Sequence, residues 1–120
     1  MEVQFEHADD DILMVRLTGR MDIAGAAEIE GPLTSQVSTK DFARVVVDLS
    51  GVPFLASIGL GLLVRTGQGV ERREGRMVLL NPQPLVAKVL TESGVSQRLH
   101  VYETMAAATN FLARLPKAGE

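Results

Sequence analysis

Two segments near the start of the chain have the two-residue periodicity of strands. Val3 and Phe5 alternate with polar neighbours, and an acidic run follows at residues 9–11. Residues 12–17 then place Leu13, Val15 and Leu17 on one face and the other three residues on the opposite face. Two such segments around a short polar stretch predict a β-hairpin. The three aspartates lack the spaced ligands and the closing glutamate of a calcium loop, so we interpret them as a solvated turn.

The apolar positions of the next segment follow helical spacing. Ala26, Ile29, Leu33 and Val37 recur every three or four residues, which predicts a helix ending before residue 40. Pro32 lies inside this segment. It should kink or split the helix, because proline removes a backbone donor and crowds the preceding turn.

Two short apolar runs, residues 45–47 and 77–80, are typical of strands that are covered on both faces. The roughly 30 residues between their starts are the natural length of a β-α-β unit. The helix of this unit is expected over residues 57–73, with Ile58 facing the sheet and Gly75 just past its end.

Three further elements complete the pattern. Pro84 suits the first turn of a helix that Gly94 ends. The apolar stripe of that helix consists of Leu85, Val86, Val89 and Leu90. Residues 99–102 predict a short last strand, and Thr104 caps a final helix through residue 115. Residues 116–120 are expected to be a frayed tail.

The predicted order is therefore β-β-α-β-α-β-α-β-α in a single domain over residues 1–120. This order predicts an α/β fold with a small, mixed and mostly parallel sheet. The hairpin supplies the antiparallel edge, and the β-α-β units supply the parallel strands.

Composition excludes several classes of function. The net charge is −3, whereas a nucleic-acid-binding protein needs a basic face, so no nucleic acid is expected as a partner. The longest uncharged stretch, residues 49–64, is shorter than the ~20 apolar residues of a membrane helix. No secretory signal begins the chain. We expect a cytoplasmic protein that does not insert into membranes.

The residue types that carry catalysis do not converge in this sequence. There is no cysteine, and neither of the two histidines, His7 and His100, has a partner at metal-ligand spacing. No nucleophile elbow and no triphosphate-binding loop occur. We therefore expect no enzyme activity, no metal and no cofactor.

The unusual segment is residues 48–61, which leads from a central strand to the start of a helix. Open α/β sheets commonly place their functional sites at this edge. Ser57 suits the N-cap position. Four glycines in the helix each lower helix propensity by roughly 1 kcal/mol relative to alanine; they are Gly59, Gly61, Gly67 and Gly69. They indicate either close internal packing or a smooth surface for another protein, and the sequence leaves both open.

Three segments together resemble anti-sigma factor antagonists of the STAS domain family: residues 17–22, 45–63 and 81–95. The resemblance covers nearly the whole chain and implies a small mixed sheet with helices mainly on one face. Matched position by position, Ser57 falls on the family's phosphoacceptor and Gly59 on its glycine. Ala56 replaces the usual acidic residue, and Ile58 replaces a second hydroxyl residue.

The resemblance implies a regulatory function without catalysis. Family members of this type bind an anti-sigma factor, a serine kinase of the histidine-kinase-like ATPase fold, and thereby free its sigma factor. Phosphorylation of the acceptor ends the binding, and a serine phosphatase reverses it. The implied partner surface includes Asp22, Ala56, Ile58, Gly59 and Gly61, although Asp22 could equally be a helix cap.

Two other interpretations remain open. Because Ala56 departs from the family pattern, the chain could be a STAS interaction subunit of a transport or signalling assembly that is never phosphorylated. The start of the helix at Ser57 could also bind a small anion or a nucleotide, although residues 48–61 include no lysine or arginine.

Overall fold

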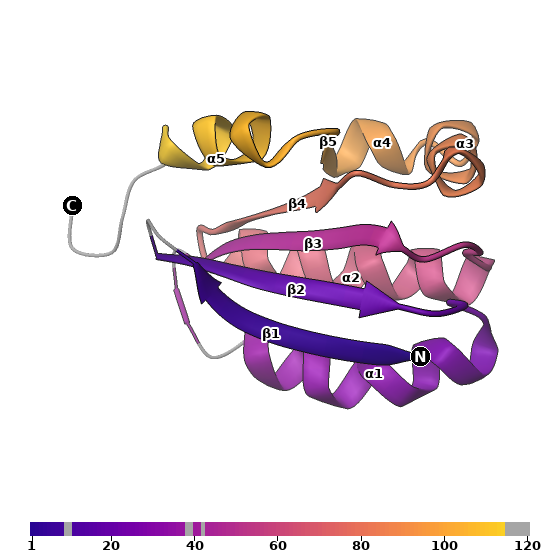
Figure 1. The fold of residues 1–120 in the computed structure, drawn as a ribbon. Coiled ribbons are helices and arrows are strands. Elements are labelled where there is room, and N and C mark those ends of the chain that lie inside the picture. Colours follow the sequence, from indigo (N-terminus) through magenta and orange to yellow (C-terminus); the bar gives the residue numbers. More distant parts are fainter. Residues whose placement is uncertain (9–10, 38–39, 42, 115–120) are drawn as a thin grey trace.

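The computed structural model describes residues 1–8, 11–37, 40–41 and 43–114, which form a five-stranded sheet with helices on both faces (Figure 1). The elements in chain order are β1 (Glu2–Ala8), β2 (Ile12–Thr18), α1 (Ile23–Val37), β3 (Arg44–Gly51), α2 (Ser57–Arg72), β4 (Arg76–Leu80), α3 (Pro84–Glu92), α4 (Val95–Arg98), β5 (His100–Tyr102) and α5 (Met105–Ala113).

The predicted hairpin is confirmed. β1 and β2 pair antiparallel from Glu2 opposite Thr18 to Ala8 opposite Ile12. Residues 9 and 10 of the acidic turn lie outside the described residues. Asp11 has a positive φ of 61°, and its carboxylate accepts a hydrogen bond from the Lys40 ammonium group at 2.6 Å.

The remaining strands pair in parallel, and their order across the sheet is their order in the chain, β1-β2-β3-β4-β5. The apolar run Val45–Val47 lies in the central strand β3 and has no exposed surface, as expected for a strand covered on both faces. The mixed, mostly parallel sheet predicted from the sequence is confirmed.

Apolar side chains form a core on each face of the sheet. The larger core packs α1 to α4 against one face, and its fully buried side chains include Val15, Ile29, Leu33, Val47, Leu63 and Leu90. The smaller core packs α5 against the other face; its buried members are Ile12, Met14, Val46, Val78, Leu80, Ala108 and Leu112. Figure 1 shows α2 running behind β2 and β3 and α5 lying above β4. Because four of the five helices pack into the larger core, the helices lie mainly on one face, as predicted.

Three local predictions are corrected by the structure. Pro32 does not split α1, which continues from Ile23 to Val37 with Pro32 on its exposed side. The short helix α4 was not predicted. The residue with left-handed backbone after α2 is Glu74, at φ 63°, and not Gly75. Gly75 is required because a Cβ there would overlap the carbonyl oxygen of Ala43.

The end of the chain agrees with the prediction as far as it is described. Thr104 caps α5, since its hydroxyl oxygen accepts a hydrogen bond from the Ala107 N–H at 3.2 Å. The described part of α5 ends at Ala113. The expected continuation to residue 115 and the tail at residues 116–120 lie outside the described residues.

Candidate functional site: the helix-start surface

Two loops are joined at the edge where the parallel strands end. The Met21 N–H donates to the Phe54 carbonyl at 2.9 Å, and the Ala56 N–H donates to the Met21 carbonyl at 3.0 Å. Met21 and Leu55 form an isolated parallel bridge. These bonds hold the start of α1 beside the start of α2.

The start of α3 is tied to the same edge. The Gln83 side-chain amide donates to the carbonyl of Ser50, near the end of β3, at 2.8 Å. The first turns of α1, α2 and α3 therefore lie at the carboxyl ends of the parallel strands β2, β3 and β4 (Figure 1). Open α/β sheets commonly have their binding sites at this edge.

Ser57 is the first residue of α2 and not its cap. Ala56 occupies the N-cap position with φ −87° and ψ 166°, and it makes no side-chain capping bond. Ser57 is exposed, and its hydroxyl makes no hydrogen bond to any described residue. The prediction of a serine cap is wrong, because the bond from Ala56 to Met21 holds Ala56 in an extended conformation. The hydroxyl is therefore not used by the fold.

Ile58 points to solvent and not to the sheet. It is 47% exposed, and only two other large apolar side chains among the described residues are comparably exposed, Ile23 at 71% and Leu85 at 54%. Each of the three lies in the first turn of a different helix, α2, α1 and α3. The predictions that Ile58 faces the sheet and that Leu85 belongs to the buried stripe are wrong. We call these three residues together with Ser57 the helix-start surface.

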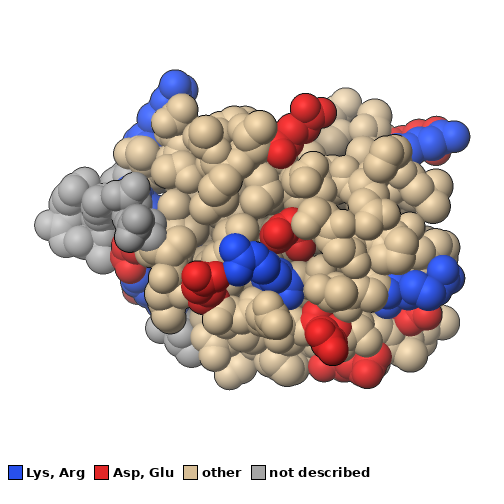
Figure 2. Space-filling model, in the orientation of Figure 1, with Lys and Arg blue, Asp and Glu red and all other residues tan. Residues whose placement is uncertain are grey.

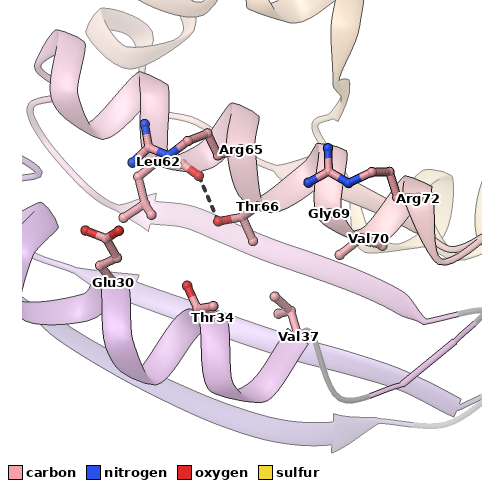
Figure 3. Close-up of a pocket in the computed structure, with 9 residues that line it drawn as sticks. All are labelled: Glu30, Thr34, Val37, Leu62, Arg65, Thr66, Gly69, Val70 and Arg72. Atoms are coloured by element: carbon pink, nitrogen blue, oxygen red, sulfur yellow. Dashed lines mark hydrogen bonds between the residues drawn. The ribbon is translucent and has the colours of Figure 1, made fainter.

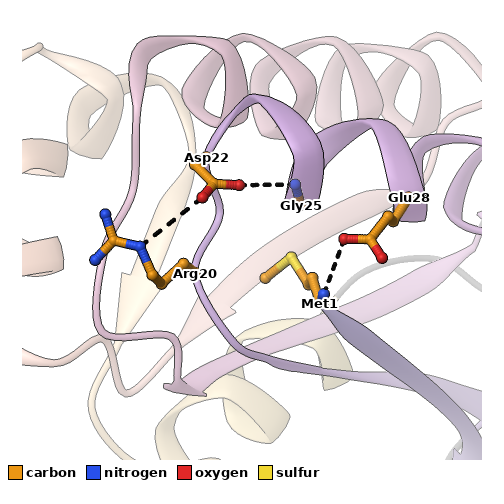
Figure 4. Close-up of polar contacts among 5 residues, drawn as sticks. All are labelled: Met1, Arg20, Asp22, Gly25 and Glu28. Atoms are coloured by element: carbon orange, nitrogen blue, oxygen red, sulfur yellow. Dashed lines mark hydrogen bonds and ion pairs between the residues drawn. The ribbon is translucent and has the colours of Figure 1, made fainter.

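Asp22 is the N-cap of α1, which confirms the alternative interpretation of this residue. Its Oδ1 accepts a hydrogen bond from the Gly25 N–H at 2.8 Å, and its Oδ2 lies 3.8 Å from Nε of Arg20 (Figure 4). The guanidinium of Arg20 lies 4.2 Å from the centroid of the Phe54 ring. Because the Asp22 side chain remains 43% exposed, capping leaves part of the carboxylate accessible.

The four glycines of α2 divide into two pairs. Gly59 and Gly67 are buried; a Cβ on Gly59 would lie 2.8 Å from side-chain atoms of Leu55 and Met21. A Cβ on Gly61 or Gly69 would approach only the guanidinium end of an arginine, at 3.1 and 3.9 Å. The expectation that Gly59 presents its backbone to a partner is wrong, because this glycine serves internal packing. Gly61 and Ala56 are partly exposed at the proposed surface.

Sequence reasoning missed Arg20, Ile23 and Leu85 at this edge. Helical periodicity assigns Leu85 to the core, but in this turn Val86 is the buried residue and Leu85 is 54% exposed. Within the described ranges, no group of three or more histidine, aspartate or glutamate side chains could hold a metal ion. No helix of the described residues is long and apolar enough to cross a membrane.

A comparison with models of known families identifies the family of the chain. The family model described as the STAS domain matches residues 4–108. The chain belongs to the STAS domain family. Among its relatives, a protein named BtrV of Bordetella bronchiseptica, described as an anti-sigma factor antagonist, is 31% identical over 90% of this chain and 93% of its own length. An anti-sigma F factor antagonist of Lysinibacillus sphaericus is 28% identical over 79% and 81%.

Solved structures share the STAS fold. An anti-sigma factor antagonist from Mycobacterium paratuberculosis superimposes with a TM-score of 0.82 at 24% identity, covering 93% of each chain. The Bacillus cell fate determinant SpoIIAA in its phosphorylated form superimposes with a TM-score of 0.67 at 24% identity, covering 92% of this chain and 99% of its own. The names of the two sequence relatives denote regulatory antagonists and not enzymes, in agreement with the sequence prediction.

Proposed function

We propose that this STAS domain is an anti-sigma factor antagonist. It binds an anti-sigma factor, a serine kinase of the histidine-kinase-like ATPase fold, through the helix-start surface and so releases the sigma factor in the cytoplasm. Phosphorylation of Ser57 ends the binding, and a serine phosphatase restores it. The observation that carries the proposal is the position of Ser57, which is exposed and makes no hydrogen bond to a described residue, at the edge where three exposed apolar side chains lie.

The apolar side chains support a protein partner. Exposed large apolar residues that gather at one place typically mark an interaction surface, whereas isolated ones need no explanation. Here the three most exposed large apolar residues of the described chain lie at one edge, held there by hydrogen bonds between the loops. Asp22, Arg20 and the partly exposed Gly61 and Ala56 would form the polar and small-residue rim that such interfaces have.

The chemistry of the acceptor supports a switch by modification. A phosphate on Ser57 would add about −1.5 to −2 charges at neutral pH. The first-turn N–H groups of α2 have no side-chain cap, and the positive end of the helix dipole favours an anion, so the phosphorylated domain should stay folded. A partner that buries Ile58 would then have to bury a dianion, which costs several kcal/mol without a counter-charge.

A second function is supported by one specific observation. Ala56 stands where the family usually has an acidic residue before the acceptor, so a kinase that reads that residue would not modify this chain. In that case the domain would be a non-phosphorylated STAS subunit of a transport or signalling assembly, using the same apolar surface.

Incubation with ATP and the ATPase-fold serine kinase of the same genome separates the two functions. We expect intact-mass spectrometry to detect one added phosphoryl group on the wild type and none on Ser57→Ala. Ser50→Ala is the matched control, because Ser50 is also exposed at this edge; it should be modified like the wild type. Kinase binding without any mass gain on the wild type would favour the non-phosphorylated subunit.

A further inference from the structure

The strand β1 leaves one long edge of the sheet unpaired. It is the outermost strand and pairs only with β2, over seven residues (Figure 1). Outside this pairing, no backbone group of residues 2–8 bonds to a described residue. Because every second residue of a strand in an antiparallel pair directs its N–H and C=O away from the neighbouring strand, a row of hydrogen-bonding groups faces outward from β1.

β1 lacks several features that usually protect such an edge. Natural edge strands are often very short, carry proline or lysine, or contain a bulge. β1 has seven residues, none of them proline or lysine, and its pairing with β2 continues without a shift of register. β5, at the opposite edge of the sheet, has only three residues. The outer edge of β1 is therefore suited to pairing with a further strand.

We propose that β1 pairs antiparallel with β1 of a second copy of this chain, about a twofold axis at Phe5. Opposite residues of such a pair lie on the same face of the sheet, so under twofold symmetry their two residue numbers have an even sum. With the axis at Phe5, all seven residues of β1 are paired. The opposite residues are then Glu2 and Ala8, Val3 and His7, Gln4 and Glu6, and Phe5 with its own copy.

The charges of β1 select this register. An axis at Gln4 would place Glu2 opposite Glu6, and an axis at Glu6 would place the two copies of Glu6 opposite each other. Like charges at opposite positions are destabilising. An axis farther from the middle, at Val3 for example, would pair only three residues of β1. The axis at Phe5 keeps the full overlap without a like-charge pair, and it sets two aromatic rings against each other, which favours the pair.

The exposed side chains at this edge are also complementary. Gln4 and Glu6 are both exposed, and the Glu6 carboxylate accepts a hydrogen bond from Arg16 of its own chain. In the proposed register, the side-chain amide of Gln4 can donate a hydrogen bond to Glu6 of the second copy. Symmetry makes this contact twice, and the ion pair of Glu6 with Arg16 can remain in place.

The helix beneath β1 presents a compact apolar residue on the same side. Glu28 accepts a hydrogen bond from the amino group at the start of β1, and Gln36 lines a cavity together with a residue near the end of β1. Another side of α1, with Glu30 and Thr34, faces α2 (Figure 3). Pro32 is exposed and lies four residues from both Glu28 and Gln36, so it is on the β1 side of α1. Pairing through β1 would bring these sides of the two α1 helices next to each other, where the short ring of Pro32 suits a close approach.

The pairing would leave the helix-start surfaces accessible. Because the two copies run in opposite directions, these surfaces would lie at opposite ends of the joined sheet. If the proposed function holds, one dimer could then bind two anti-sigma factors; the pairing itself does not depend on that function.

Single cysteines test the register, because the chain has no cysteine of its own. With oxidised glutathione, Phe5→Cys should form a disulfide-linked dimer, since Cα atoms of opposite residues lie about 4.5–5.5 Å apart. Val3→Cys is the matched control: Val3 is also partly buried on this face, but it would lie opposite His7 of the second copy and should not cross-link. Cross-linking of Val3→Cys or Gln4→Cys in place of Phe5→Cys would overturn the proposal, as would no cross-linking of a folded Phe5→Cys.

Sedimentation equilibrium of the full chain tests the pairing without cysteines. We expect the wild type to dimerise reversibly with a dissociation constant below about 1 mM. Gln4→Glu should raise this constant about two- to thirtyfold, because like charges then oppose each other at two positions, and Gln4→Lys should lower it. Within one chain the order is reversed, because residue 4 lies opposite Arg16 on β2, so Gln4→Glu should have the higher melting temperature in dilute solution. A wild type that stays monomeric at about 1 mM, or equal dissociation constants of the two variants, would contradict the pairing.

Discussion

At the scale of single residues, the structure separates two polar side chains that the sequence could not tell apart. Asp22 accepts the Gly25 N–H at 2.8 Å, whereas Ser57 makes no bond to the described fold. The sequence pattern suits a cap at both positions. The tertiary bond from the Ala56 N–H to the Met21 carbonyl accompanies an N-cap at Ala56. α2 therefore starts one residue earlier than a Ser57 cap would require, and the Ser57 hydroxyl makes no bond to a described residue.

The two residues should therefore respond differently to alanine. Asp22→Ala should lower the free energy of unfolding by about 0.5–2 kcal/mol, the value of an N-cap. Ser57→Ala should stay within about 0.5 kcal/mol of the wild type, as surface substitutions do. Urea denaturation of the three proteins measures both values. A loss of 1 kcal/mol or more in Ser57→Ala would contradict the assignment of Ala56 as the cap.

Two glycines of α2 make a matched pair for a second prediction. Gly59→Ala should destabilise the domain by about 1–3 kcal/mol, because the new methyl overpacks against Met21 and Leu55. Gly61→Ala should stabilise it by up to about 1 kcal/mol, since only the flexible end of Arg65 must move. The melting temperatures of the two variants, compared with that of the wild type, test this prediction. An equal effect of both substitutions would show that Gly59 is not packed as described.

At the scale of elements, hydrophobic periodicity was enough to predict all five strands and four of the five helices. It missed α4, which has only four residues and therefore no periodicity of its own. It also misplaced Ile58 and Leu85. The buried residues of these first turns are the neighbouring Gly59 and Val86, so Ile58 and Leu85 lie on the outer side of their helices.

The helix starts should matter for binding more than for folding. Ile23→Ser, Ile58→Ser and Leu85→Ser each remove an exposed apolar side chain, so each should retain the wild-type melting temperature within a few degrees while its affinity for the anti-sigma factor falls. Ala106→Ser is the control, because Ala106 is exposed on α5 at the other face of the sheet. Calorimetric titration gives the affinities. Unchanged affinity in all three variants would exclude the helix-start surface as the interface.

Pro32 allows a further prediction at this scale. α1 continues through Pro32, yet the proline cannot donate the backbone hydrogen bond expected at that position. Pro32→Ala should restore this bond and raise the free energy of unfolding, by at most the ~3 kcal/mol by which the two residues differ in helix propensity. A lower stability of the alanine variant in urea denaturation would indicate that the proline fits a conformation that the helix requires.

At the scale of the whole molecule, the space-filling view shows a face on which charged side chains are sparse and uncharged surface prevails (Figure 2). The net charge of the chain is −3, and the described residues include no group of three or more histidine, aspartate or glutamate side chains that could hold a metal ion. The family resemblance places the partner surface at the edge of the sheet where the parallel strands end, and this placement stays a prediction. The resemblance could not reveal which residues there are exposed, because exposure depends on which side of each first turn faces the core.

The central claim is that the charge on Ser57 controls binding to the anti-sigma factor, and affinity measured by calorimetric titration tests it most directly. Wild type and Ser57→Ala should bind equally, whereas the phosphorylated protein and Ser57→Asp should bind at least about tenfold more weakly, equivalent to about 1.4 kcal/mol. Ser50→Asp places the same charge on another exposed serine of this edge and should bind like the wild type. Equal affinity of the phosphorylated and unphosphorylated proteins would contradict the account.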